Sequence, residues 1–146
     1  MNRNEHGFSV IELIVVAGLM ALIATLGVGA YKVAQTRNNV EIAAVTVAQT
    51  MRRAQALAQG MDGDQVWGVR ITSSGVTIFQ GTSYATRITS RDEIYALSGK
   101  LTVTGTSEFT FAKMTGLPTL AGSVTVQGQQ NATKTITIST VGMVSY

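Results

Sequence analysis

The first half of the chain carries two hydrophobic patterns in succession. From Phe8 to Ala30 the residues are almost all apolar, and Glu12 is the one charged residue among them. As a helix rising about 1.5 Å per residue, this run would measure about 34 Å, whereas the hydrocarbon core of a bilayer is about 30 Å thick. The pattern therefore predicts a helix over residues 8–30 that can span a membrane.

Beyond Ala30 the pattern becomes amphipathic. Apolar residues recur at spacings of three, four and once seven, which is the period of one helix face. The residues of this face are Val33, Val40, Ala44, Val47, Met51, Ala54 and Ala58. We expect the helix to continue over residues 31–60 and to end at Gly60, a natural C-terminal cap, before a turn at Asp62–Asp64.

The remainder of the chain, residues 61–146, changes to short segments rich in β-branched residues. Seven segments alternate apolar and polar positions, which is typical of half-buried strands. They are "QVWGVRI", "GVTIFQ", "KLTVTG", "EFTFA", "SVTVQG", "KTITIS" and "GMVSY". One face would carry Val76 with Ile78, Leu101 with Val103, Phe109 with Phe111, Val124 with Val126 and Ile136 with Ile138. The predicted fold class is α+β, a long helix packed on an antiparallel sheet or sandwich.

Composition narrows the function classes. The chain has 146 residues, 45% of them hydrophobic, with no cysteine and a formal net charge of +3. The basic residues are scattered, and only Arg52 and Arg53 are adjacent, so we do not expect a nucleic-acid groove. The single histidine, His6, precedes the apolar run, which leaves the rest of the chain without imidazole or thiol. We therefore expect neither an enzyme nor a cofactor.

Two pairs of carboxylates were considered as sites. Asp62 and Asp64 offer hard oxygen ligands for calcium, but few further carboxylates are near in sequence, so a plain turn is the preferred interpretation. Asp92 and Glu93 are neighbours whose side chains would diverge on a strand or a helix, which favours solvation in a loop. No metal site is predicted.

Glu12 calls for an explanation. A carboxylate deep in a bilayer costs about 2.5 to 3.5 kcal/mol on insertion scales, so it should have a partner or a function. Its place about 6 Å of helix from Phe8 also allows a chance position near the membrane interface. A removable secretory signal is a further alternative, although its apolar region is usually about 7 to 15 residues long and this run is longer.

The stretch "GFSVIEL" resembles the N-terminal signature of type IV pilins and of the pseudopilins of type II secretion. The resemblance implies that "MNRNEHG", residues 1–7, is a leader peptide. A prepilin peptidase would cut between Gly7 and Phe8 and methylate the new amine of Phe8. Glu12 would then take the acidic position that pairs with the amine of a neighbouring subunit during filament assembly.

The β-rich part is similar to the H-type minor pseudopilins, whose globular part is a β-sandwich. Without cysteine, this chain lacks the disulfide-closed loop of many major pilins. Some relatives bind DNA through arginines beside the terminal glycine, but Met143 and Val144 follow Gly142 here. DNA binding is therefore not expected.

Glycines in the apolar run disfavour an isolated helix by up to about 1 kcal/mol each relative to alanine. Gly27 and Gly29 would either let helices pack closely or allow local unwinding when the subunit leaves the membrane. Many pilins have a proline in this part of the helix, whereas this chain has Gly29. We assign helix flexibility to these two glycines.

The expected role is a structural subunit of a pilus or pseudopilus, with other subunits, the prepilin peptidase and the inner membrane as partners. Before assembly it would be a single-pass membrane protein with its β-rich domain outside the cytoplasm. Lys32 and Arg37, just after the apolar run, outweigh Arg3 and weakly favour the opposite orientation. The alternatives are an anchored or secreted β-domain that binds a target without polymerising and, least favoured, a hydrolytic enzyme.

Overall fold

The computed structural model describes residues 8–146, except for the side chains of residues 26–28. Its first element is one continuous helix, α1 (Val10–Gln59), as the two successive hydrophobic patterns predicted. The chain divides by packing into two units, one before Thr36 and one comprising Thr36–Tyr146. In the first unit the structure describes only helix and the two residues before it.

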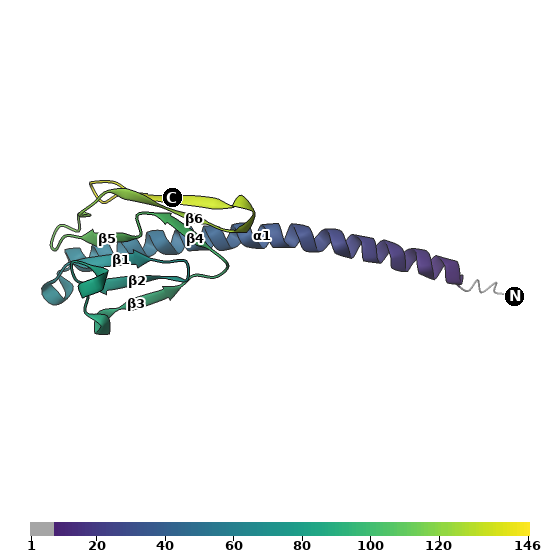
Figure 1. Ribbon diagram of the computed structural model, residues 1–146, viewed down its shortest axis with the longest axis horizontal. Helices are drawn as coiled ribbons and strands as arrows, with labels where there is room; N and C mark the ends of the chain where they lie inside the picture. The colour runs from purple at the N-terminus through teal and green to yellow at the C-terminus, as the bar shows by residue number, and fades with distance from the viewer. Residues whose placement is uncertain (1–7) are drawn as a thin grey trace, which may run out of the picture. The chain divides into compact units, whose positions relative to one another are not determined.

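The second unit combines the end of α1 with eight strands in two antiparallel sheets (Figure 1). One sheet has the strand order β3-β2-β1-β5 and the other the order β4-β6-β7-β8. The strands are β1 (Trp67–Ile71), β2 (Gly75–Gln80), β3 (Glu93–Ala96), β4 (Thr102–Gly105), β5 (Glu108–Phe111), β6 (Gly122–Gln127), β7 (Thr133–Ile138) and β8 (Val144–Ser145). The predicted α+β class, a long helix packed on antiparallel sheets, is confirmed.

The two connections predicted from polar segments are hairpins. β1 and β2 pair antiparallel across Thr72–Ser74, and β6 and β7 pair antiparallel across the short 3₁₀ turn η4 (Gln129–Asn131). Other connections cross between the sheets, because β4 belongs to the second sheet while β3 and β5 belong to the first.

The buried face of α1 supplies one wall of the core. Six of the seven residues predicted for this face are at most 2% exposed, and Val33, the seventh, is half-buried. Ala43 and Ala48 are buried beside them. These side chains form one cluster with apolar residues from both sheets. Burial of this face explains why an amphipathic sequence forms a stable helix here, since packing contributes more than helix propensity.

The inward positions of the strands also follow the predicted alternation. All ten residues predicted for the inner face are buried, except Val103, which is half-buried. Phe79 lies on the opposite face of the first sheet and is nevertheless fully buried. Its ring makes an edge contact with the ring of Tyr84. Gly68, paired with Phe79, makes room for that ring, because a Cβ there would lie 2.4 Å from a ring carbon.

Two local features differ from the sequence predictions. Strand β3 was not predicted. Its polar residues Glu93 and Tyr95 are half-buried, whereas the apolar Ile94 between them is 73% exposed, which is the reverse of the usual pattern. The left-handed residue at the end of α1 is Met61, with φ 54°, and not Gly60. The amide of Gly60 still donates to the carbonyl of Ala56, so the helical bonding continues one residue further.

Candidate functional site

The start of α1 is built by Ser9 and Glu12. The amide of Leu13 donates to the carbonyl of Ser9 at 3.2 Å, which makes Ser9 the N-cap and Glu12 the third residue of the first turn. Serine followed three residues later by glutamate is the sequence of a capping box. A carboxylate in the first turn is also stabilised by the helix dipole. Ser9 was missed as a site residue, although this spacing was visible in the sequence.

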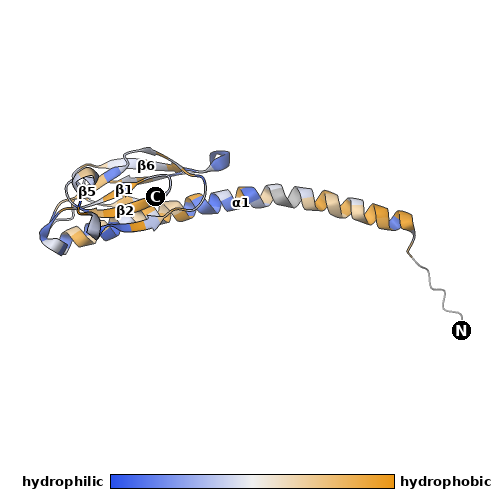
Figure 2. Ribbon diagram, turned by 60° about the horizontal axis from the view of Figure 1, so that its bottom comes forward, coloured by the Kyte–Doolittle hydropathy of each residue, from blue (hydrophilic) through white to orange (hydrophobic). Residues whose placement is uncertain are grey.

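The apolar side chains that follow have no cover. Phe8 is 82% exposed, and the large apolar residues from Val10 to Ile23 are exposed on every side of the helix. In Figure 2 the first turns of α1 are mostly orange, interrupted by a blue band near the N-terminal end. By length and composition α1 can cross a membrane. An all-round apolar helix requires lipid or protein around it, because water would otherwise contact this whole surface.

The structure describes Phe8, Gly27 and Gly29, but not Gly7, of the residues predicted for processing and helix flexibility. Gly7, the residue before the expected cut, lies outside the described residues. Phe8 lies just before α1 begins, and the expected cleavage and methylation there stay predictions. α1 runs without a break through Gly27 and Gly29, and a Cβ on Gly29 would meet nothing within 4 Å. Flexibility at these glycines stays a prediction.

The two aspartates considered for calcium are engaged by cations. Asp64 accepts an ion pair from Lys113 at 2.6 Å, and Asp62 lies 3.8 Å from Arg91. The carbonyl of Asp62 also accepts hydrogen bonds from the indole of Trp67 and the amide of Gln80. Among residues 8–146 no three His, Cys, Asp or Glu side chains gather as metal ligands would. The contacts agree with the preferred interpretation of a structural turn.

The second pair of acids is not solvated in a loop as predicted. Asp92 binds Arg87, which is 5 residues before it, and Glu93 binds Arg53, which is 40 residues before it. The two side chains therefore do diverge, but each of them pairs with an arginine. The Arg53 guanidinium contacts both carboxylate oxygens of Glu93, at 2.6 and 2.8 Å, and the hydroxyl of Tyr95 donates to the same carboxylate at 3.0 Å. The hydrogen bonds from Arg53 lower the pKa of Glu93, partly opposed by burial. Burial, followed by the hydrogen bond to Glu93, raises the pKa of Tyr95.

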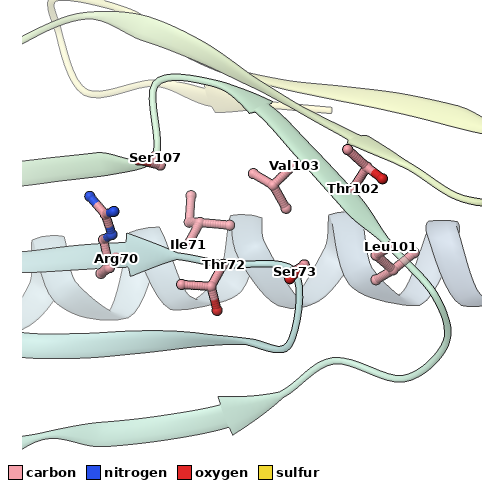
Figure 3. Close-up of a pocket in the computed structure, with 8 residues that line it drawn as sticks. All are labelled: Arg70, Ile71, Thr72, Ser73, Leu101, Thr102, Val103 and Ser107. Carbon is pink, nitrogen blue, oxygen red and sulfur yellow. The ribbon is translucent and has the colours of Figure 1, made fainter.

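A groove of about 490 Å³ separates the end of β1 from the edge strand β4 (Figure 3). Ile71, Leu101 and Val103 supply its apolar lining, and Arg70, Thr72, Ser73, Thr102 and Ser107 its polar lining. The guanidinium of Arg70 pairs with Glu108 at 3.3 Å. Because this lining offers hydroxyls and one engaged arginine without a base to activate them, it does not suggest a catalytic centre.

No protein-family model, curated protein or solved structure matches this chain. Its function therefore has to be argued from the helix, the β unit and their residues.

Proposed function

We propose that this chain is a prepilin or pseudopilin, a structural subunit that is processed after Gly7 and polymerises through its N-terminal helix. The proposal rests on the motif "GFSVIEL" and on the fold class, a long helix with an apolar first half followed by an antiparallel β unit. Before assembly the subunit is held in the inner membrane by α1, with Thr36–Tyr146 outside the cytoplasm.

The observation that carries the proposal is the exposed apolar surface that begins at Phe8. The second unit has a core of its own, so the earlier residues of α1 are not needed to complete it. Lipid before assembly and the helices of neighbouring subunits afterwards would both cover such a surface. A helix used only as an anchor has the same need for lipid, and in it the first-turn acid would serve only as part of the helix cap.

Glu12 is the residue that favours a polymerising subunit over a plain membrane anchor. Once the leader is removed, the amine of Phe8 and the carboxylate of Glu12 are two opposite charges at one end of an apolar helix. Drawn into a filament core, each is desolvated, and a buried charge without a partner is strongly unfavourable. Pairing between the amine of one subunit and Glu12 of its neighbour compensates both and fixes their axial register.

The first test replaces the acid. Glu12→Val should insert into the membrane as well as the natural chain, because a charge is removed from an apolar segment. It should reduce recovery in sheared filaments at least tenfold, measured by quantitative immunoblotting of filament and membrane fractions. Leu13→Val is the matched control, a neighbouring change that keeps the acid, and should assemble normally.

Mass spectrometry of the N-terminus tests the processing. In cells with their own prepilin peptidase, the mature chain should start at methylated Phe8. A chain that starts at Met1 and never enters filaments would instead support the alternative, an anchored β unit that binds a target without polymerising. Normal assembly of Glu12→Val would contradict the role given to the acid.

A further inference from the structure

In the second unit, cationic side chains outnumber carboxylate side chains, so some cations lie outside ion pairs. Every carboxylate side chain of Thr36–Tyr146 is in an ion pair; the pairs are Arg53–Glu93, Arg70–Glu108, Arg87–Asp92, Arg91–Asp62, Lys113–Asp64 and Lys134–Glu41. Three cations of this unit remain outside these pairs, namely Arg37, Arg52 and Lys100. Arg52 donates a hydrogen bond to the carbonyl of Val144. The hydrogen bond leaves Arg52 charged, so the positive surplus comprises all three cations; Arg37 and Lys100 are both exposed.

These two cations belong to segments that meet at one end of the unit. Gly99 lies against Asn39, since a Cβ on this glycine would be 3.0 Å from the amide nitrogen of that asparagine. Gly128 likewise lies against Thr36 and Val40 of α1. The segments 36–41, 97–101 and 127–134 are thus neighbours, and we call them the basic end of the unit.

The third cation of the basic end is Lys134. Its ammonium pairs with Glu41 at 2.8 Å, and Glu41 is the only acid in the three segments. Arg37, Glu41 and Lys134 line one open groove of about 280 Å³. The same segments also carry exposed amides, Asn38 on α1 and residues 129–131 of η4, which are neutral hydrogen-bond donors. The basic end thus has a net charge of +2 and donors suited to phosphate oxygens.

The basic end begins only a few residues after the proposed membrane span in the sequence. Arg37 follows Ala30, the last residue of the apolar run, by seven residues. Even a fully extended chain of this length spans at most about 25 Å. Lys32 and Arg37 were the residues that counted against the expected orientation under the positive-inside rule. A basic end with a role of its own would account for Arg37 on that side.

We propose that the basic end binds the phosphate headgroups of an anionic bilayer and docks the β unit onto the membrane before assembly. The contact rests on the proposed membrane anchoring, but not on processing or polymerisation. It would act electrostatically, so it should weaken with salt and depend on the lipid charge. Each cation near an anionic surface favours the docked state by roughly fivefold.

The test uses the full chain reconstituted in vesicles of neutral phosphatidylcholine, with or without about one third phosphatidylglycerol. Because the chain has no cysteine, Thr102→Cys gives a single exposed labelling site at the start of β4, next to segment 97–101 of the basic end. Energy transfer from this label to rhodamine-labelled lipid reports docking. Thr140→Cys, near the end of α1 through the contact of Gly142 with Gln55, is the control position.

We expect higher transfer from position 102 in phosphatidylglycerol vesicles than in neutral vesicles, and we expect this difference to be lost at about 0.5 M salt. Replacing Arg37 and Lys100 together by glutamine should lower the docked-to-undocked ratio by roughly 25-fold, at fivefold per cation. The matched control, Arg52→Gln with Lys113→Gln, removes the same charge elsewhere and should retain most of the transfer.

The outcomes separate this inference from the anchoring on which it rests. A chain that fails to float with either vesicle would refute the anchor itself. A chain that floats with both vesicles but gives equal transfer in neutral and anionic lipid would overturn the docking alone. Equal losses in the two double variants would also overturn it, because net charge and not the basic end would then be responsible. Competition by inorganic polyphosphate for the same response would support the phosphate contact.

Discussion

The two halves of α1 are the same secondary structure in different surroundings. Up to Gln35 the side chains are exposed wherever the structure describes them, apart from half-buried Val33, and from Val40 onward one face is fully buried. The sequence marks this change by the spacing of its apolar residues, all around the helix first and on one face afterwards. Helix formation alone therefore does not indicate the surroundings of a segment. The distribution of apolar residues around the helix axis does, because a fully apolar surface needs cover on every side and a one-sided surface needs it on one face.

A pair of methionines on α1 should give the largest contrast. Met51 is fully buried and Met20 is 67% exposed. Met51→Ala should destabilise the second unit by about 2 to 5 kcal/mol, because it leaves a cavity in the core. Met20→Ala should leave that stability unchanged. Chemical unfolding of the detergent-solubilised chain, followed by the fluorescence of Trp67, measures both; a similar loss in both variants would contradict the division of α1.

A pair of glycines sharpens the same contrast at a smaller scale. Gly68→Ala should destabilise the second unit by about 1 to 3 kcal/mol, since its Cβ would press on the ring of Phe79 and lie 2.9 Å from the carbonyl of Phe109. A Cβ at Gly18 meets nothing within 4 Å. Gly18→Ala should not affect the unfolding of the β unit in the same assay. Its effect on filament assembly would show whether neighbouring subunits need that space.

Acid should produce the smallest effect, and only in the second unit. Because Arg53 lowers the pKa of Glu93 below its usual value near 4.5, the pair stabilises the fold fully above that value. The contribution is lost as the pH falls through the lower pKa of the folded state. Glu93→Gln should therefore flatten the dependence of unfolding on pH below about 4.5. Arg53→Gln should flatten it similarly, and the double variant should add little.

Local patterns were enough to predict most of the fold. The helix, seven strands and the buried face of α1 follow from apolar spacing, because burial selects residue type at each position. β3 escaped prediction because its half-buried Glu93 is held by Arg53, a contact across 40 residues that has no local signature. Tyr95 in turn donates to the carboxylate of Glu93. The same long-range contact explains why the prediction of a solvated Glu93 was wrong. Asp92 pairs with Arg87, only 5 residues before it, so that ion pair was within reach of a local prediction.

The candidate site divides along similar lines. Glu12 was recognised from sequence, and Ser9 could have been, because the N-cap and its acid are three residues apart. The basic end could not be predicted, since Arg37, Lys100 and Lys134 come from three segments that only the tertiary fold brings together. The expected cleavage after Gly7 stays a prediction, because it would depend on a peptidase and Gly7 lies outside the described residues.

The buried face of α1 alternates small and large side chains, with Met51 between Ala48 and Ala54, all three fully buried. Sliding the helix along its axis by one turn, about 5.4 Å, would drive the methionine into space shaped for an alanine or valine. The packing of this face therefore resists sliding of the helix along its axis. Tension applied along the helix would have to break this registration before it could draw the helix out of its β unit.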